Sequence, residues 1–145
     1  MIRTKDKKMG RFSVNVELCN YNDLANAAAG FIRKDEVRRM TLPGVVDTGA
    51  VRLVIPERVS RALGLQETGK VRVRYADRRS ALRPLVGGLY LGYSGRDGVF
   101  DAIVEPKRDT ALIGAIVLET LDFVVDPTHQ KLVPRDPKYP IAEIE

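Results

Sequence analysis

The sequence predicts a single, mainly β domain. The apolar residues are mostly Val, Leu and Ile, and two of these are β-branched residues that favour strands. Several segments alternate apolar and polar residues, which is the period of a strand with one buried face. A chain of 145 residues is long enough for one hydrophobic core and too short for two domains of ordinary size. We therefore expect one lobe, with one or two short helices.

The first strand is predicted in RFSVNVEL, because its apolar residues recur at every second position. The NYND cluster that follows predicts a turn. The next segment is ambiguous, since its alanines favour a helix while Gly30 interrupts one. We interpret it as an excursion that leads into a second strand, which runs from near Val37 to Asp47.

The middle of the chain predicts a strand, a helix and a long hairpin. VRLVI is typical of a strand, and Pro56 is typical of a helix start, so we expect a helix from Glu57 to Leu63 that ends at Gly64. The segment KVRVRYADRRSALRPLVGGLYLGY predicts a hairpin whose tip lies around residues 75–80. A second turn, in YSGRDG, then leads to the strand VFDAIVE.

The last third predicts short elements. A polar loop at residues 107–110 precedes ALIG, a short buried strand, and AIVLETLD, a second short helix. FVVD and KLV are predicted strands, with the turn DPTHQ between them. We divide the chain into a basic, disordered tail at residues 1–9, a folded domain at 10–134 and a Pro-rich C-terminal tail at 135–145.

Composition limits the classes of protein. The single cysteine, Cys19, cannot form an intrachain disulfide, and one histidine, His129, leaves too few ligands for a structural zinc site. We therefore expect a reducing, cytoplasmic setting. No signal-peptide segment follows the basic N-terminus, and the most apolar stretch is interrupted by Glu119 and Asp122, so we expect neither export nor a membrane partner.

The stretch PGVVDTGAV places a carboxylate at the end of an apolar strand. A glycine after Asp47 and Thr48 lets backbone N–H groups approach the carboxylate oxygens. Two such loops that face each other would share one proton, so that one carboxyl acts as a base and the other as an acid. The chain has one Asp-Thr-Gly, and Asp109-Thr110-Ala111 lacks the glycine. A pair of aspartates would therefore need two copies of the chain on a twofold axis.

These residues resemble the retropepsin-like aspartic proteases, and in particular the small cellular and prokaryotic members of clan AA. The resemblance covers most of residues 10–134. It rests on Val45-Val46-Asp47-Thr48-Gly49-Ala50, on Leu112-Ile113-Gly114 before a short helix, and on a hairpin between them at the place of the family's flap. The tip reads YADRRS, whereas the retroviral members have a glycine-rich tip, and the paired glycines Gly87 and Gly88 fall in the returning arm.

The resemblance implies a single-lobe, retropepsin-like barrel and a homodimeric aspartic endopeptidase. Asp47 would be the catalytic aspartate, and water would be activated between two copies of it, without a metal or an organic cofactor. Thr48 would hydrogen-bond across the dimer, Gly49 would supply the turn and an N–H group, and Ala50 would line the cleft. The supporting strand would contain Leu112, Ile113 and Gly114. The flap residues that contact substrate would be Tyr75, Ala76, Asp77, Arg78 and Arg79.

The expected partners are a second copy of the chain and a peptide or protein substrate. One alternative is a non-catalytic peptide-binding dimer of the same fold. Another is a DNA-binding regulator, because GAVRLVIPERVSRALGLQETGKVRVRY also resembles the swapped-hairpin domains of the AbrB type. The net charge of +5 and the basic residues Arg52, Arg58, Arg61 and Lys70 would suit that role. That motif covers about a third of the chain and leaves DTG and LIG unexplained, so we do not expect nucleic acid as a partner.

Five arginines crowd the predicted flap: Arg72, Arg74, Arg78, Arg79 and Arg83. Such a cluster is either a solvated face of the hairpin or a device that steers acidic peptides to the cleft. We interpret it as a solvated face.

Overall fold

The structure is a computed structural model that describes residues 11–145. The predicted N-terminal tail at residues 1–9 lies outside the described residues. The main sheet contains β1 (Arg11–Asn20), β2 (Arg39–Asp47), β3 (Leu53–Pro56), β4 (Gln66–Arg74), β5 (Ser80–Tyr93), β6 (Arg96–Glu105) and β7 (Ala111–Ile113). A separate hairpin consists of β8 (Phe123–Asp126) and β9 (Lys131–Pro134). The helices are α2 (Tyr21–Ala28), α3 (Glu57–Leu63), α4 (Ala115–Leu121) and the 3-10 helix η1 (Lys34–Glu36).

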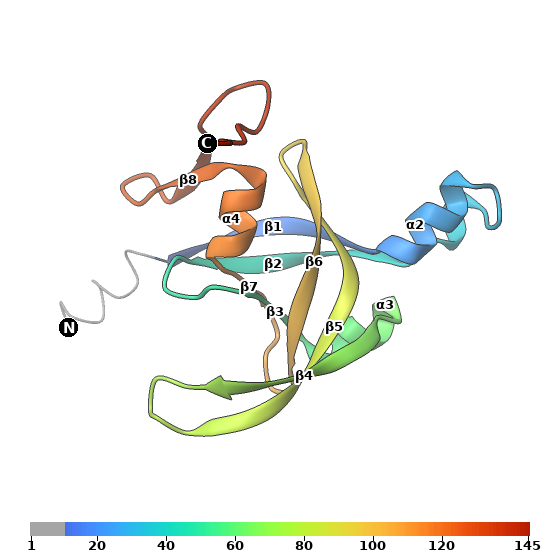
Figure 1. Cartoon of the computed structure of the whole chain (residues 1–145), viewed down its shortest axis with the longest axis horizontal. Helices are drawn as coiled ribbons and strands as arrows, with labels where there is room; N and C mark the ends of the chain where they lie inside the picture. The colour runs from blue at the N-terminus through green and yellow to red at the C-terminus, as the bar shows by residue number, and fades with distance from the viewer. Residues whose placement is uncertain (1–10) are drawn as a thin grey trace.

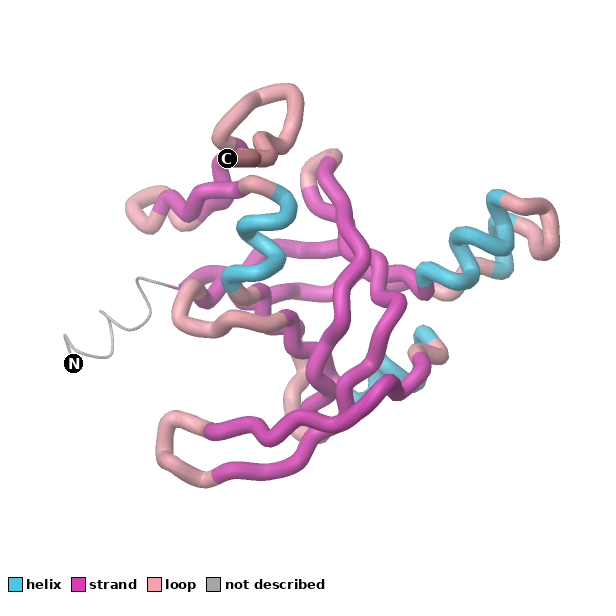
Figure 2. The backbone as a smooth tube through the Cα atoms, in the orientation of Figure 1, coloured by secondary structure: helices cyan, strands magenta, loops and turns pink. Residues whose placement is uncertain are grey.

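The main sheet closes into a six-stranded barrel (Figures 1 and 2). Its strand order is β1-β2-β7-β3-β6-β5, and β5 pairs again with β1, while β4 continues outward from β5. The β2–β7 and β3–β6 pairs are parallel, and the others are antiparallel. The prediction of a mainly β, single-domain fold is confirmed. A closed barrel with a few short helices is compatible with the predicted retropepsin-like barrel.

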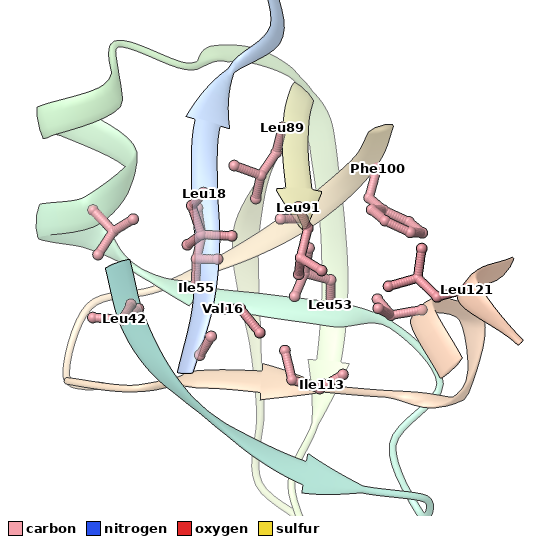
Figure 3. Packing of buried hydrophobic residues seen from close by; sticks show 14 of the residues in the cluster. Val16, Leu18, Leu42, Leu53, Ile55, Leu89, Leu91, Phe100, Ile113 and Leu121 are labelled. Carbon is pink, nitrogen blue, oxygen red and sulfur yellow. The ribbon is translucent and has the colours of Figure 1, made fainter. Parts of the chain in front are cut away.

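The hydrophobic core fills the inside of the barrel (Figure 3). The strands β1, β2, β3, β6 and β7 contribute alternate residues, as the period-two patterns predict, while β4 contributes no buried residue. The largest fully buried side chains include Leu18, Leu53, Ile55, Leu63, Leu89, Leu91 and Ile113. Leu42 and Val46 of β2 belong to the same cluster as residues of β1, β3, β5 and β7. β2, which ends at Asp47, is therefore held by the whole core rather than by a local contact.

The prediction of a turn at NYND is wrong, since a helix begins there. The Asn20 Oδ1 atom accepts a hydrogen bond from the Asp23 backbone N–H at 3.0 Å, which caps the N-terminus of α2. Asp23 in turn accepts from the backbone and the guanidinium of Arg38. The residues that favour turns also favour helix caps, so the composition of NYND does not distinguish the two. Residues 11–145 therefore contain three short α-helices, of which α2 is the one that the sequence did not predict.

The other predicted elements are present. The second strand ends at Asp47, and α3 follows Pro56 and ends at Gly64, which has the left-handed φ of 65° that favours glycine. The long hairpin is β4–β5, with its tip at residues 75–79. None of the helices in residues 11–145 has the length and apolar character needed to cross a membrane.

The C-terminal segment, residues 135–145, contains no helix or strand and folds back beside β8 and β9 (Figure 1). The buried Asp122 carboxylate accepts a hydrogen bond from the Ile141 backbone N–H at 2.8 Å and pairs with Arg135 at 2.5 Å. Arg135 also pairs with Glu143 at 3.1 Å. The Arg96 guanidinium donates to the Asp136 carbonyl. These contacts attach the predicted tail to the end of α4.

Candidate active site

The Asp47 carboxylate lies where β2 ends and the chain turns through residues 48–52 into β3. Its Oδ1 atom accepts a hydrogen bond from the Gly49 backbone N–H at 2.9 Å, and its carbonyl accepts from the Ala50 N–H at 3.1 Å. A Cβ atom on Gly49 would lie 3.2 Å from Oδ1, while the φ of Gly49 is not positive. Glycine is thus favoured here because it leaves room beside the carboxylate, and not because the turn needs a left-handed residue.

The N-terminus of α4 holds this loop from the other side. The Ala115 N–H donates to the Ala50 carbonyl at 2.8 Å, and the Ile116 N–H donates to the Val51 carbonyl at 2.9 Å. The residue before the helix is Gly114, where an added Cβ would lie 2.5 Å from the Arg52 carbonyl oxygen. Only a glycine lets the helix approach the loop this closely, because no side chain could occupy that space.

The predicted supporting residues lie beneath the loop. The parallel pairing of β2 with β7 places Leu112 beside Val45 and Ile113 beside Val46. Ile113 is buried in the core, whereas Leu112 reaches the pocket described below. The LIG segment therefore anchors the end of β2 to the barrel.

Arg11 forms an ion pair with Asp47 that the sequence analysis missed. The Arg11 Nη2 atom lies 3.0 Å from Asp47 Oδ2, and the Asp47 side chain is only 16% exposed. The pair arises because the antiparallel register of β1 and β2 sets Arg11 opposite Asp47. The sequence signals both strands, but it does not set their register, so no pattern in it singles out Arg11.

Thr48 is exposed, and its side chain makes no hydrogen bond within the part of the chain that the structure describes. The predicted bond across the dimer involves a second copy and stays a prediction.

A pocket of about 860 Å³ lies between the Asp47 loop and the β4–β5 hairpin, which occupy the same side of the barrel in Figure 2. The predicted site residues that line it are Asp47, Gly49, Ala50, Tyr75, Ala76 and Leu112. Thr48, Asp77, Arg78, Arg79, Ile113 and Gly114 do not line it. The pocket is thus lined by the Asp47 loop and by the base of the hairpin tip, which is Tyr75 and Ala76. The far end of the tip, residues 77–79, does not line it.

The far end of the tip is stabilised by its own side chains. Asp77 accepts from the Arg79 backbone N–H at 3.0 Å and pairs with its guanidinium at 2.6 Å, and these bonds lower the pKa of the Asp77 carboxyl. Arg78 adopts a φ of 72°, a left-handed conformation that costs about 1 kcal/mol in a residue with a Cβ. The tip therefore makes its turn without the glycines of the retroviral flap.

Tyr75 attaches the base of the tip to the barrel. Its hydroxyl donates to Glu105 Oε2 at 2.6 Å, and Arg83 Nε donates to the Tyr75 hydroxyl at 3.1 Å and to Glu105 Oε1 at 3.0 Å. Burial and the bond to Glu105 raise the pKa of the Tyr75 hydroxyl, so it stays protonated at neutral pH. No pattern in the sequence points to Glu105, because its partners are 22 and 30 residues away along the chain.

The basic residues proposed for DNA binding do not form a separate module. β3 pairs with β6 and β7, and β4 pairs with β5, so the AbrB-like segment is part of the main sheet. Arg58 donates to the Asp109 carbonyl, Arg61 pairs with Glu57 and Lys70 pairs with Glu67.

The chemical groups that the pocket offers for acid or base catalysis are carboxylates. Asp47 is fixed at the edge of an open pocket, while the other lining carboxylate, Glu105, is held by Tyr75 and Arg83. Within residues 11–145, no three His, Cys, Asp or Glu side chains cluster in a way that could hold a metal ion.

The chain matches no protein-family model and no curated protein. Among solved structures it is similar to the foamy viral protease-reverse transcriptase, in a structure with an RNA/DNA hybrid, with 20% sequence identity and a TM-score of 0.46. The similarity covers 66% of this chain and 11% of the viral one.

Proposed function

We propose that the protein is a homodimeric aspartic endopeptidase, a hydrolase in which Asp47 and the same residue of a second copy activate a water molecule. The observation that carries the proposal is the position of the Asp47 carboxylate. It lies at the edge of a pocket, it accepts a hydrogen bond from Gly49, and α4 holds its loop in place.

The two aspartates have different roles in this reaction, one as a base and the other as an acid. Like charges at close range cannot both ionise at little cost, so the pair holds one proton. The ionised carboxylate takes a proton from water, whose oxygen attacks the peptide carbonyl carbon, while the other carboxyl gives its proton to the carbonyl oxygen. The tetrahedral diol then breaks its C–N bond, the amine takes a proton from one carboxyl, and a diol hydroxyl returns a proton to the other.

Exposed apolar residues beside the Asp47 loop support the proposal that a second copy of the chain binds there. The Val51 side chain is 67% exposed and Ile116 is 46% exposed, and a backbone hydrogen bond joins these two residues directly behind Ala50. Apolar side chains grouped on a surface are typical of contacts between chains. A twofold axis through this region would cover both residues and bring the two Asp47 loops together.

The test is cleavage of a mixed peptide library, followed by mass spectrometry from acid to neutral pH. Cuts should disappear in Asp47→Asn, and the rate for the native protein should rise faster than linearly with protein concentration. The control is Asp109→Asn, which changes the aspartate of the Asp-Thr-Ala segment and should leave cleavage unchanged. Cuts that persist in a folded Asp47→Asn protein would contradict the proposal.

A non-catalytic peptide-binding dimer is the second candidate. The Arg11–Asp47 ion pair favours it, because Arg11 occupies an oxygen that the reaction needs. A folded, dimeric native protein that binds library peptides and cuts none at any pH would identify this function.

A further inference from the structure

The pocket beside Asp47 carries an excess of positive charge. Its basic lining residues are Arg11, Arg52, Arg72, Arg74, Lys107 and Arg108, while its acidic ones are Asp47 and Glu105. We propose that this pocket selects peptide segments with Asp or Glu on both sides of an apolar residue. This inference deepens the proposed protease function and rests on it for the position of the cut.

The charges of the acidic residues are already matched. Asp47 pairs with Arg11 at 3.0 Å, and Glu105 pairs with Arg83, which does not line the pocket, at 3.0 Å. Arg108 donates only to the carbonyl and the hydroxyl of Thr110, which are neutral. Within residues 11–145, the lining residues without an ion-pair partner are Arg52, Arg72, Arg74, Lys107 and Arg108. Five positive charges around one pocket are therefore left for a ligand to neutralise.

These charges come from three segments of the chain. Arg72 and Arg74 lie on β4, Lys107 and Arg108 lie in the loop between β6 and β7, and Arg52 is the last residue of the Asp47 loop. A chain that crosses the pocket would meet cations before and after the residue beside Asp47. Acidic residues on both sides of the cut would each find a basic partner.

The uncharged lining distinguishes a peptide from a nucleic acid. Val54, Val73, Ile103 and Leu112 line the same pocket and offer an apolar surface to a side chain. Proteins that bind single-stranded nucleic acid use aromatic side chains on which bases stack. Among residues 11–145, Tyr75 is the one aromatic residue in the lining, and its hydroxyl is held by Glu105 and Arg83. An apolar residue between acidic ones fits both parts of the surface.

The five arginines of the predicted flap, which we interpreted as one solvated face, lie in different surroundings in the structure. Arg78 and Arg79 lie at the far end of the tip, and Arg83 belongs to the Tyr75–Glu105 network. Of these five arginines, only Arg72 and Arg74 line the pocket. The alternative interpretation, that the arginines steer acidic peptides to the cleft, therefore applies to these two of the five.

The test measures binding to Asp47→Asn, so that cleavage does not consume the probe. The probes are two fluorescent peptide sets with the same apolar residues, one flanked by Asp and Glu and the other by Asn and Gln. By fluorescence anisotropy at low salt, the acidic set should bind at least about 10-fold more tightly, and the difference should shrink as salt is raised.

Matched variants locate the effect. Arg72→Gln with Arg74→Gln, in the Asp47→Asn background, should remove most of the preference for acidic peptides. Arg33→Gln with Lys34→Gln removes the same charge at exposed residues outside the pocket and should leave the preference unchanged. Equal binding of the two peptide sets, or an equal loss in both double variants, would overturn the inference.

The two proposals fail in different ways. If acidic peptides bind as described and the native protein cuts none of them, the charge preference holds and the protease function fails. If the native protein cuts both sets at the same kcat/KM, the protease function holds and the charge preference fails. Tighter binding by a single-stranded oligonucleotide of equal charge, lost in Arg72→Gln with Arg74→Gln, would overturn the choice of a peptide.

Discussion

Arg11 and Asp47 face each other across the β1–β2 pair, with Arg11 Nη2 at 3.0 Å from Asp47 Oδ2. The positive charge of the Arg11 guanidinium offsets the negative charge of the Asp47 carboxylate, which lines the pocket. In the proposed dimer two such carboxylates approach each other, and each Arg11 reduces their repulsion. The same contact that occupies one oxygen of Asp47 would therefore help two copies to associate.

Arg11→Gln should weaken dimerisation by up to about fivefold at low salt, because the Arg11 side chain is largely exposed and such pairs contribute at most about 1 kcal/mol. Sedimentation equilibrium of both proteins gives the dissociation constants. At 1 M salt, where charges are screened over about 3 Å, the difference should vanish. A tighter dimer in the variant would mean that Arg11 keeps the two carboxylates apart.

Gly114→Ala should lower the free energy of unfolding by about 1–3 kcal/mol, because its Cβ would overlap the Val51 and Arg52 carbonyl groups and force α4 away from the Asp47 loop. Chemical denaturation measures the change. Gly69→Ala is the matched control, since its Cβ would meet nothing within 4 Å, and it should stay within about 1 kcal/mol of the native protein. Equal losses in both variants would contradict the argument from space.

Tyr90 should ionise at a higher pH than an ordinary tyrosine hydroxyl. Burial and its hydrogen bond to Asp97 raise the pKa of the Tyr90 hydroxyl to about 12. A raised pKa in the folded state means that Tyr90 contributes stability fully below about pH 10, and that this contribution is lost as the pH rises through about 12. Phenolate absorbance should show a late step that Tyr90→Phe removes and that Tyr139→Phe, at an exposed position, preserves. A late step that survives in Tyr90→Phe would assign it elsewhere.

Truncation after Pro140 should destabilise the protein at neutral pH and much less in acid. The Ile141 N–H and the Arg135 guanidinium lower the pKa of the Asp122 carboxyl. A lowered pKa in the folded state contributes stability that is present above about pH 4 and lost as the pH falls through the folded value. Urea denaturation at pH 7 and pH 3 compares the full chain with the truncated one.

Ile144→Ala is the control for that truncation, because Ile144 is 86% exposed, and it should match the full chain at both pH values. If the truncated chain lost the same stability at pH 3 as at pH 7, the contact with Asp122 would not be the cause.

The sequence by itself determined the elements that depend on neighbouring residues. The apolar run before Asp47, the proline and glycine that bound α3, and the alternation in β4 are patterns of residues close together in the chain, so the sequence predicts them. The Asp-Thr-Gly segment likewise carries its own hydrogen bond between Gly49 and Asp47. The interpretation of NYND failed because its residues suit a turn and a helix cap equally well.

Only the tertiary structure decided which distant groups meet at the site. The pairing of Arg11 with Asp47 depends on the register of β1 and β2, two strands that are separated by residues 21–38. The hydrogen-bond network of Tyr75, Glu105 and Arg83 depends on how the β4–β5 hairpin packs against the end of β6. The division of the arginines between pocket and solvent follows from the same packing. A strand pattern specifies which face of each strand is buried, but closing the barrel sets which residues of different strands lie opposite each other, and that depends on the core as a whole.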